Sequence, residues 1–393
     1  MEFFQTLEKS LEKFPNLGKM AYKFSKVWKN GEQMNDKALN QVSLDEFKML
    51  SAGGKAPYFV ENGRSFHALV AQQFTRPMLE DLCSLATCVR RIAKTREGSS
   101  FLQSRLFDKR AMLYFAQPST RTFLSFDAAC QTVGLDCVNV RDSSTSSEVK
   151  GESPEDTIRT FSSYTDLIVM RHPAGGFAEE IAWMLSNTSR PVPVINAGSG
   201  KDQHPTQALL DIYTLERSFE NAGGIDGKTV AFVGDLKRGR TVRSLAWLLT
   251  KYNDVKIFFV APPELQIRDD IIAYLDGANV SYEITGDFEG VIPKVDAIYM
   301  TRIQDEWDVG NESSLIDTSK FYFTKDHLSL LKKDAVIMHP LPRRKEIDVA
   351  VDSDPRAVYW RQVRNGMWIR SALILSIFNC DQKVRDYYKE HNV

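Results

Sequence analysis

Short apolar runs alternate along most of this chain with segments whose apolar side chains recur at helical spacing. The apolar runs are typical of buried strands: AMLYF (111–115), DCVNV (136–140), DLIVM (166–170), VPVIN (192–196), TVAFVGD (229–235), VKIFFV (255–260), VDAIYM (295–300) and DAVIM (334–338). The helical segments between them include PEDTIRTFSSY (154–164), PTQALLDIYTL (205–215) and RTVRSLAWLLT (240–250). Such alternation predicts βαβ units, in which helices cover both faces of a parallel sheet.

The length and apolar content of the chain indicate more than one folding unit. With 393 residues, of which 43% are hydrophobic, the chain should form about two domains. The apolar runs suffice for two sheets, and the polar, Gly-rich stretch NAGSGKDQHPTQ (196–207) is the expected hinge. Residues 1 to about 65 are polar and mixed in charge, so we expect an added N-terminal element of two short helices without chemistry of its own.

The charge balance and the cysteines exclude several classes of protein. The 50 basic and 51 acidic side chains leave a net charge of −1, which does not favour binding to nucleic acid or to an acidic membrane surface. No apolar run approaches the ~18 residues of a membrane span, and the N-terminus lacks the apolar core of a signal peptide. The five cysteines, without CxxC spacing, suggest neither disulfides nor zinc. We therefore expect a soluble, cytoplasmic enzyme.

The segment AQPSTRTFLSF (116–126) leaves a predicted strand and opens an amphipathic helix. Ser119, Thr120 and Thr122 can each cap the first helical turn, but one cap needs only one hydroxyl. Arg121 stands among them. Free backbone N–H groups, the helix dipole, hydroxyls and a guanidinium together favour an anion, and phosphate is the expected ligand.

Loops after six of the predicted strands carry cations with few carboxylates to offset them. These cations are Arg121, Arg171, Lys237, Arg240, Arg302, Arg343 and Arg344. Because ligands bind at the carboxyl ends of strands in open α/β sheets, these loops predict a basic cleft for phosphate and carboxylates. The near match GDLKRGRT (234–241) to a P-loop has Arg240 in place of the lysine, and GxGxxG and metal-ligand spacings are absent.

Six motifs resemble those of aspartate carbamoyltransferase catalytic chains, in the same order and from about residue 70 to the C-terminus. They are PSTRT, MRHP, GKDQHPTQ, GDLKRGRTVRSL, TRIQ and MHPLPRR. The resemblance implies two doubly wound α/β domains with the active site in the cleft between them, no cofactor, and no metal. It divides the chain into an extension of unknown role (1–66), a carbamoyl-phosphate-binding domain (67–205, completed by 362–393) and an aspartate-binding domain (206–361).

The resemblance also implies transfer of the carbamoyl group from carbamoyl phosphate to L-aspartate, a step of pyrimidine synthesis, and it assigns a role to each motif. The residues expected to bind carbamoyl phosphate are Ser119, Thr120, Arg121, Thr122, Arg171, His204, Gln207, Leu341 and Pro342. Among these, Thr122, Arg171, His204 and Gln207 are the expected catalytic residues. Donors aimed at the carbonyl oxygen and at the departing phosphate would stabilise the charge that develops there.

Aspartate would be bound by a second set of residues, one of which comes from another subunit. This set is Lys150, Arg240, Arg302 and Gln304. Ser146 and Lys150 match a loop that in this family enters the neighbouring active site, so a homotrimer is the expected minimum unit. These motifs leave open whether a regulatory chain binds.

Two positions depart from the family pattern and leave alternatives open. Gln117 stands where an acidic residue is expected, and Trp307 stands where arginine is common. In better-known members of the family, the charged side chains at these two positions help to latch the closed domains. One alternative is a carbamoyltransferase with another amino-acid acceptor. Arg240, Arg302 and Gln304 argue against it, because they suit a dicarboxylate such as aspartate. The other is a weakly active scaffold paralogue.

Overall fold

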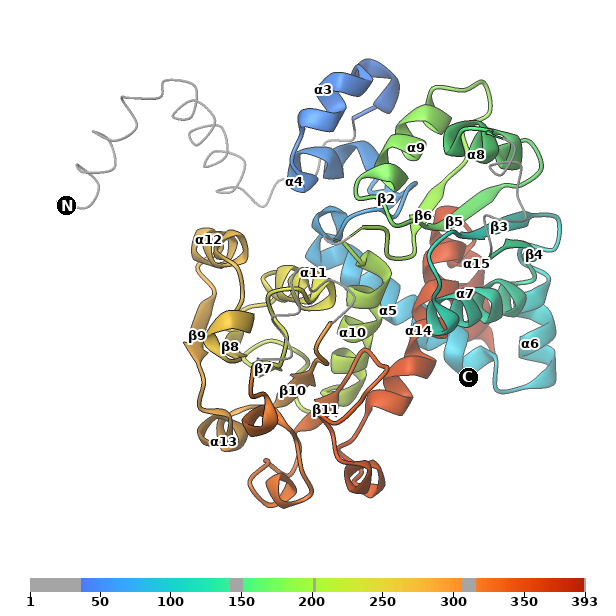
Figure 1. The fold of residues 1–393 in the computed structure, drawn as a ribbon. Coiled ribbons are helices and arrows are strands. Elements are labelled where there is room, and N and C mark those ends of the chain that lie inside the picture. The colour runs from blue at the N-terminus through green and yellow to red at the C-terminus, as the bar shows by residue number, and fades with distance from the viewer. Residues whose placement is uncertain (1–36, 142–150, 201–202, 305–315, 392–393) are drawn as a thin grey trace, which may run out of the picture.

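The chain folds around two parallel β-sheets that lie side by side (Figure 1). The computed structural model describes residues 37–141, 151–200, 203–304 and 316–391. The first sheet has four strands in the order β4-β3-β5-β6, and the second has five in the order β11-β10-β7-β8-β9. In both sheets the order reverses at a central strand, so the predicted α/β class with two doubly wound domains is confirmed.

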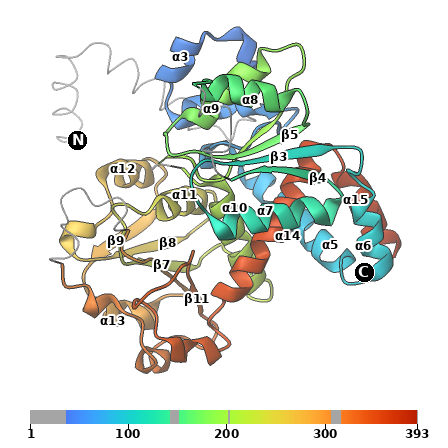
Figure 2. The same ribbon diagram turned by 45° about the vertical axis from the view of Figure 1, so that its right-hand side comes forward.

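The first sheet is built from the early apolar runs and is covered on both faces (Figure 2). Its strands are β3 (Arg110–Phe115), β4 (Asp136–Val140), β5 (Leu167–Arg171) and β6 (Val194–Asn196), and its helices are α7 (Thr120–Val133), α8 (Pro154–Ser162) and α9 (Phe177–Ser186). Because side chains alternate along a strand, Leu113 packs on the α7 side and Met112 on the α9 side.

The second sheet follows the same plan but contains one strand that the sequence pattern did not predict. Its strands are β7 (Thr229–Val233), β8 (Lys256–Val260), β9 (Ser281–Thr285), β10 (Ala297–Met300) and β11 (Val336–Met338), with α11 (Arg240–Leu249), α12 (Asp269–Gly277) and α13 (Phe288–Val291). The unpredicted strand is β9, at the sheet edge, where no residue is fully buried. Its sequence, SYEIT, alternates polar and apolar residues and so lacks the apolar run by which the other strands were recognised.

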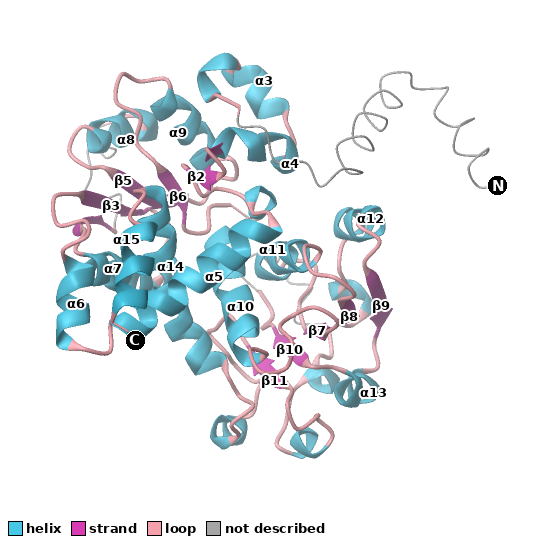
Figure 3. Ribbon diagram, turned by 180° about the vertical axis from the view of Figure 1, so that it is seen from behind, coloured by secondary structure: helices cyan, strands magenta, loops and turns pink. Residues whose placement is uncertain are grey.

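Three helices lie between the two sheets (Figure 3). Their side chains join both sheets in one continuous apolar core. The helices are α5 (Arg76–Ile92), α10 (Pro205–Ser218) and α14 (Tyr359–Ile377), beside which lie α6 (Arg96–Gln103) and α15 (Asp381–Glu390). Helix α14 packs against α5, α7 and α10, and its apolar residues Ile369, Leu373 and Ile377 are buried. This shared core holds the strand ends of the two sheets facing each other. None of the described helices is long and apolar enough to cross a membrane.

The described part of the N-terminal element packs against the outer face of the first sheet. It contains α3 (Leu44–Met49), α4 (Ala52–Lys55), β1 (Val60–Glu61) and β2 (Arg64–Ser65). Phe47 and Phe59 are fully buried in the cluster that includes α9, and Lys55 pairs with Glu179 of that helix. Short 3₁₀ turns occur here and elsewhere, at Leu39–Gln41, Ala56–Phe59, Ala71–Gln73, Pro263–Leu265, Ile292–Lys294, Ser319–Phe321, Asp326–Ser329 and Val349–Ser353.

A buried histidine fastens this element to the first sheet. His67 Nδ1 accepts a hydrogen bond from the backbone N–H of Val194 (3.1 Å), and its Nε2 lies 2.9 Å from Ser186 Oγ. Burial lowers the pKa of His67 to about 3 from an ordinary value of 6.5. Below pH 6.5 the unfolded chain therefore binds more protons at this residue than the folded chain, and stability falls as the pH falls.

We predict that His67→Asn makes the free energy of unfolding less dependent on pH, because asparagine keeps an acceptor for Val194 and cannot take up a proton. The wild type should lose up to about 1.4 kcal/mol per pH unit from this group at acidic pH. Urea unfolding at pH 7.5, 6.0 and 5.0 measures the difference, with the exposed His391→Asn as the control. If the free energy of unfolding changed with pH by the same amount in wild type and in His67→Asn, the neutral, buried state assigned to His67 would be contradicted.

Candidate active site

A cavity of about 430 Å³ lies between the carboxyl ends of the two sheets and is lined by arginines. Its five arginines are Arg121, Arg171, Arg240, Arg302 and Arg370. None of the described residues that line it is an aspartate or glutamate. Within the described part of the chain, no group of three or more His, Cys, Asp or Glu side chains could hold a metal ion. The cavity is therefore a concentrated cationic site suited to anions.

The N-terminus of α7 provides one wall of the cavity. Ser119 is the N-cap residue, yet its side chain makes no capping hydrogen bond, so its hydroxyl is not used to satisfy the helix. Ser119, Arg121 and Thr122 line the cavity, whereas Thr120 is exposed and does not. The backbone N–H groups of this first turn and these side chains thus lie together at the cavity, with donors of the kind that the predicted anion site would use.

The ends of β5 and β6 bring Arg171 and His204 close together. Arg171 is largely buried and donates from Nη1 to the backbone oxygen of Ala197 (3.2 Å). Gly198 lies against both side chains with φ 103°, and a Cβ there would stand 2.6 Å from Arg171 Nη1 and 3.0 Å from the His204 ring. Only glycine allows this close approach and this backbone conformation.

His204 is held as a neutral imidazole. Burial, followed by the positive charges of Arg240, Arg171 and Arg370, lowers its pKa well below the usual 6.5. A neutral ring carries a single N–H, and Nδ1 of His204 is buried with no hydrogen-bond partner among the described residues. The side chain can therefore donate one hydrogen bond to a ligand without itself being protonated.

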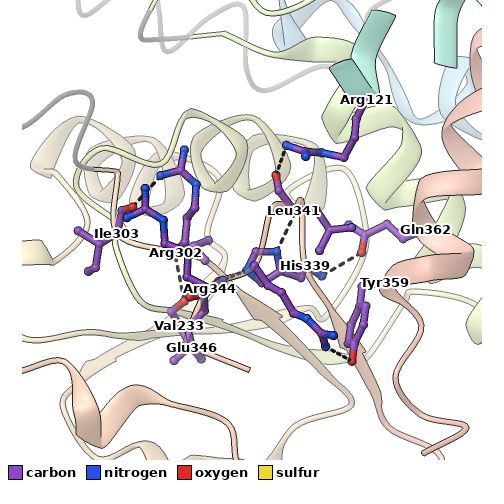
Figure 4. Close-up of polar contacts among 12 residues, drawn as sticks. Arg121, Val233, Arg302, Ile303, His339, Leu341, Arg344, Glu346, Tyr359 and Gln362 are labelled. Carbon is purple, nitrogen blue, oxygen red and sulfur yellow. Dashed lines mark hydrogen bonds and ion pairs between the residues drawn. The ribbon is translucent and has the colours of Figure 1, made fainter. Parts of the chain in front are cut away.

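The second sheet supplies the opposite wall. Arg240, the first residue of α11, donates from Nη1 to the carbonyl oxygens of Gly198 (2.8 Å) and Gly200 (2.5 Å), and so crosses from one sheet to the other. Arg302 follows β10 and donates to the backbone oxygen of Ile303 at 2.8 Å (Figure 4). Arg240, Arg302 and Gln304 all line the cavity, as the sequence predicted.

The buried side chain of Asp235 fixes the loop that carries Gln304. Its Oδ2 accepts from the backbone N–H of Gln304 (3.1 Å), and its Oδ1 accepts from that of Arg238 (3.1 Å). The P-loop-like segment thus uses its carboxylate to join two strand-end loops.

The loop after β11 places Leu341 and Pro342 at the cavity. His339 accepts at Nδ1 from the N–H of Leu341 (2.7 Å), and its Nε2 lies 2.8 Å from Glu346 Oε1 (Figure 4). Leu341 has φ 56°, and its carbonyl oxygen accepts from Arg121 Nη2 at 2.9 Å. His339 therefore orders the loop, while Leu341 and Pro342 line the cavity.

Three of the predicted cations do not reach the cavity. Lys237, Arg343 and Arg344 are absent from its lining. Arg343 instead pairs with Asp352 and donates to Tyr359 OH at 3.2 Å, away from the cavity. The prediction that Arg343 lies in a loop at the end of a strand is confirmed, but a sequence does not tell which way each side chain turns. Ser146, Lys150 and Trp307 lie outside the described residues.

The sequence reasoning missed cavity residues that come from helices. Arg370 and Gln362 of α14 line the cavity, and Arg370 is 3% exposed. Burial lowers the pKa of Arg370 to about 10. Arg370 stands three residues before Leu373 and seven before Ile377, on the apolar stripe of α14, and a cation at such a position was the signal that could have revealed it.

Comparison with known proteins agrees with this geometry. Residues 67–217 match the carbamoyl-P binding domain of aspartate/ornithine carbamoyltransferases, and residues 226–377 match the Asp/Orn binding domain of the same proteins. Aspartate carbamoyltransferase 1 of Pisum sativum, a chloroplastic protein, is 41% identical over 89% of this chain and 90% of its own. The catalytic subunit of Vibrio cholerae is 45% identical over 67% of this chain and 84% of its own.

Solved structures of aspartate transcarbamoylases are also similar. The Trypanosoma cruzi enzyme in complex with aspartate and phosphate has a TM-score of 0.69 and 37% identity, covering 79% of this chain and 95% of that one. The catalytic subunit of M. Jannaschii aspartate transcarbamoylase has a TM-score of 0.69 and 36% identity, covering 80% of this chain and 98% of that one.

The relatives correct one expectation and establish the family. A cytoplasmic location was wrong, because the similar proteins of Pisum sativum, Arabidopsis thaliana and Oryza sativa are chloroplastic. The charge and composition of folded domains carry no record of compartment, since targeting signals are separate segments. With both family domains matched in order over most of its length, the chain belongs to the aspartate/ornithine carbamoyltransferase family.

Proposed function

We propose that the arginine-lined cavity is where this chain transfers the carbamoyl group of carbamoyl phosphate to the amino group of L-aspartate. The products are N-carbamoyl-L-aspartate and phosphate, and the reaction belongs to de novo pyrimidine biosynthesis. The observation that carries the proposal is the cavity itself, in which five arginines meet without a carboxylate. Such a site requires ligands with several negative charges, which these two substrates supply.

Carbamoyl phosphate would bind at the first-sheet wall. Its phosphate would lie at the N-terminus of α7 and accept from the hydroxyls of Ser119, Thr120 and Thr122 and from Arg121. Thr120 would have to turn inward, because it is exposed in this structure. Arg171 would reach both the phosphate and the carbamoyl oxygen.

The chemical step would depend on donors aimed at the carbamoyl oxygen. Attack of the aspartate amine forms a C–N bond and breaks the bond from carbon to the phosphate oxygen, with negative charge rising on both oxygens. Thr122, Arg171 and His204 would stabilise that charge, while Gln207 and the carbonyls of Leu341 and Pro342 would hold the carbamoyl NH₂. The departing phosphate can accept the amine proton, so no separate base is required.

Aspartate would bind at the second-sheet wall. Arg240, Arg302 and Gln304 would hold its two carboxylates, with Lys150 contributed by a neighbouring subunit. The Trypanosoma cruzi structure in complex with aspartate and phosphate supports this pairing of ligands for a similar fold. A homotrimer, in which Ser146 and Lys150 complete the next site, is the assembly that this arrangement requires.

We predict that His204→Ala lowers kcat by about 10²- to 10³-fold, because one preorganised donor to the developing oxyanion is lost. His204→Gln, which retains a donor, should lose less. Since the pKa of His204 is far below neutral, removing the ring should not remove any acidic limb of the pH–rate profile between pH 6 and 8. Steady-state rates across that range test this, with His391→Ala as the control, and loss of such a limb in His204→Gln would contradict a neutral donor.

We predict that Arg302→Ala raises the KM for L-aspartate roughly 10- to 100-fold, since charge-assisted hydrogen bonds to a carboxylate are lost. The affinity for carbamoyl phosphate, measured by calorimetry without aspartate, should stay nearly unchanged. Arg243→Lys is the matched control, because Arg243 lies on α11, outside the cavity lining, and pairs with Asp270. If Arg302→Ala weakened the binding of carbamoyl phosphate as much as that of L-aspartate, the assignment of Arg302 to the aspartate carboxylates would be contradicted.

We predict that two inactive variants restore activity when mixed, if neighbouring subunits share each site. Arg121→Ala and Lys150→Ala would each be nearly inactive alone. In a mixed trimer one interface combines an intact Arg121 with an intact Lys150, giving about one third of the wild-type sites. Activity after unfolding and joint refolding measures this, and mixtures no more active than the separate variants would exclude shared sites.

A further inference from the structure

A fully buried carboxylate on α10 gathers three side chains directly behind the cavity. Gln207 Nε2 donates to Asp211 Oδ1 (3.0 Å), and Gln362 Nε2 donates to the same oxygen (2.7 Å). Tyr299 OH donates to Oδ2 (2.8 Å). These partners come from α10, α14 and β10, so Asp211 joins one turn of its own helix to the second sheet and to α14.

The chemistry of a carboxylate decides how both amides are turned. Both glutamines present their NH₂ to the same oxygen, Oδ1 of Asp211, which accepts both bonds whether or not Oδ2 carries a proton. Gln362 gives an independent check, because its Oε1 accepts from the backbone N–H of His339 (2.9 Å). That contact requires the same orientation of the Gln362 amide.

The orientation of Gln207 matters because this residue also lines the cavity. With Nε2 held by Asp211, the carbonyl oxygen points away from the carboxylate, and no described residue donates to it. A carbamoyl group offers N–H donors at this place, whereas an acetyl group of similar shape offers a methyl. An amide free to turn over would also present its own NH₂ to the cavity and would lose this distinction.

The electrostatic cost of this carboxylate argues that it serves the site. Asp211 makes no ion pair with any described residue, and burial raises its pKa to about 7. The hydrogen bonds from Gln362, Tyr299 and Gln207 oppose that rise, as does the positive charge of Arg370 on α14. A well-packed apolar side chain would cost less at this position, since burying an unpaired charge is unfavourable.

We propose that Asp211 is a positioning residue that locks the Gln207 amide with its oxygen toward the cavity, so that the site selects carbamoyl phosphate over acyl phosphates that lack the NH₂ group. This inference rests on the proposed function, because it assumes that the carbamoyl group binds beside Gln207. Asp211 itself contacts no substrate.

The proposal is tested by how well the site discriminates between carbamoyl phosphate and acetyl phosphate. The KM for carbamoyl phosphate and the inhibition constant of acetyl phosphate against it would be measured for wild type, Asp211→Leu, Asp211→Asn and Gln207→Leu. Asp211→Leu should weaken carbamoyl phosphate binding about tenfold and leave acetyl phosphate binding unchanged, as Gln207→Leu should. Asp211→Asn should behave like wild type, because Gln362 holds its oxygen toward the two amides.

A double variant separates positioning from general damage. When Gln207 is already leucine, adding Asp211→Leu should not change the discrimination between carbamoyl phosphate and acetyl phosphate any further, because Asp211 acts through the Gln207 amide. If Asp211→Leu does not fold, Asp211→Ser, which is too short to hold Gln207, takes its place. The proposal would be overturned if a folded Asp211→Leu or Asp211→Ser variant lost affinity for carbamoyl phosphate and acetyl phosphate equally. It would also be overturned if such a variant discriminated between them as the wild type does. A wild type that transfers no carbamoyl group to aspartate would instead overturn the proposed function.

Discussion

Repulsion among cations that surround one cavity is the constraint on which this structure depends. Burial and the charge of Arg302 lower the pKa of Arg121, and neighbouring arginines help to keep His204 neutral. No carboxylate among the described lining residues relieves that repulsion. Anionic substrates therefore supply what the protein lacks, and each bound anion gains the attraction of several guanidinium groups at once.

The scaffold offsets this repulsion with a continuous core and with backbone oxygens. Helices α5, α10 and α14 bury one apolar cluster across both sheets, so the opposing walls are held by packing. Arg121 donates to the carbonyl of Leu341, and Arg240 donates to those of Gly198 and Gly200. These carbonyl groups hold the cations in place at the two walls. Asp211 contributes from behind, where it organises amides instead of neutralising charge.

The sequence was most informative where burial and strand-end position coincide. Parallel strands buried on both faces are recognisable as apolar runs, which is why β3, β5, β7 and β10 were predicted, whereas the half-exposed edge strand β9 was not. Loops at strand ends meet in space, so Arg171 and Arg302 could be placed in one cleft from the sequence alone.

Side-chain direction and long-range pairing were beyond the sequence. Arg343 follows a strand as Arg302 does, yet it turns toward Asp352. Arg370 lies within a helix, not in a strand-end loop, and was missed. The domain boundaries and the roles of individual residues stay predictions, including those of Ser146 and Lys150, which lie outside the described residues.

The most direct test of the paired-anion cleft is carbamoyl transfer by the purified protein from carbamoyl phosphate, with L-aspartate and L-ornithine compared side by side. The arginines and Gln304 at the second-sheet wall predict transfer to aspartate, the dicarboxylate, and none to ornithine, whose side-chain amine would meet guanidinium groups. Transfer to ornithine at a comparable rate, or no transfer to either acceptor, would contradict this account.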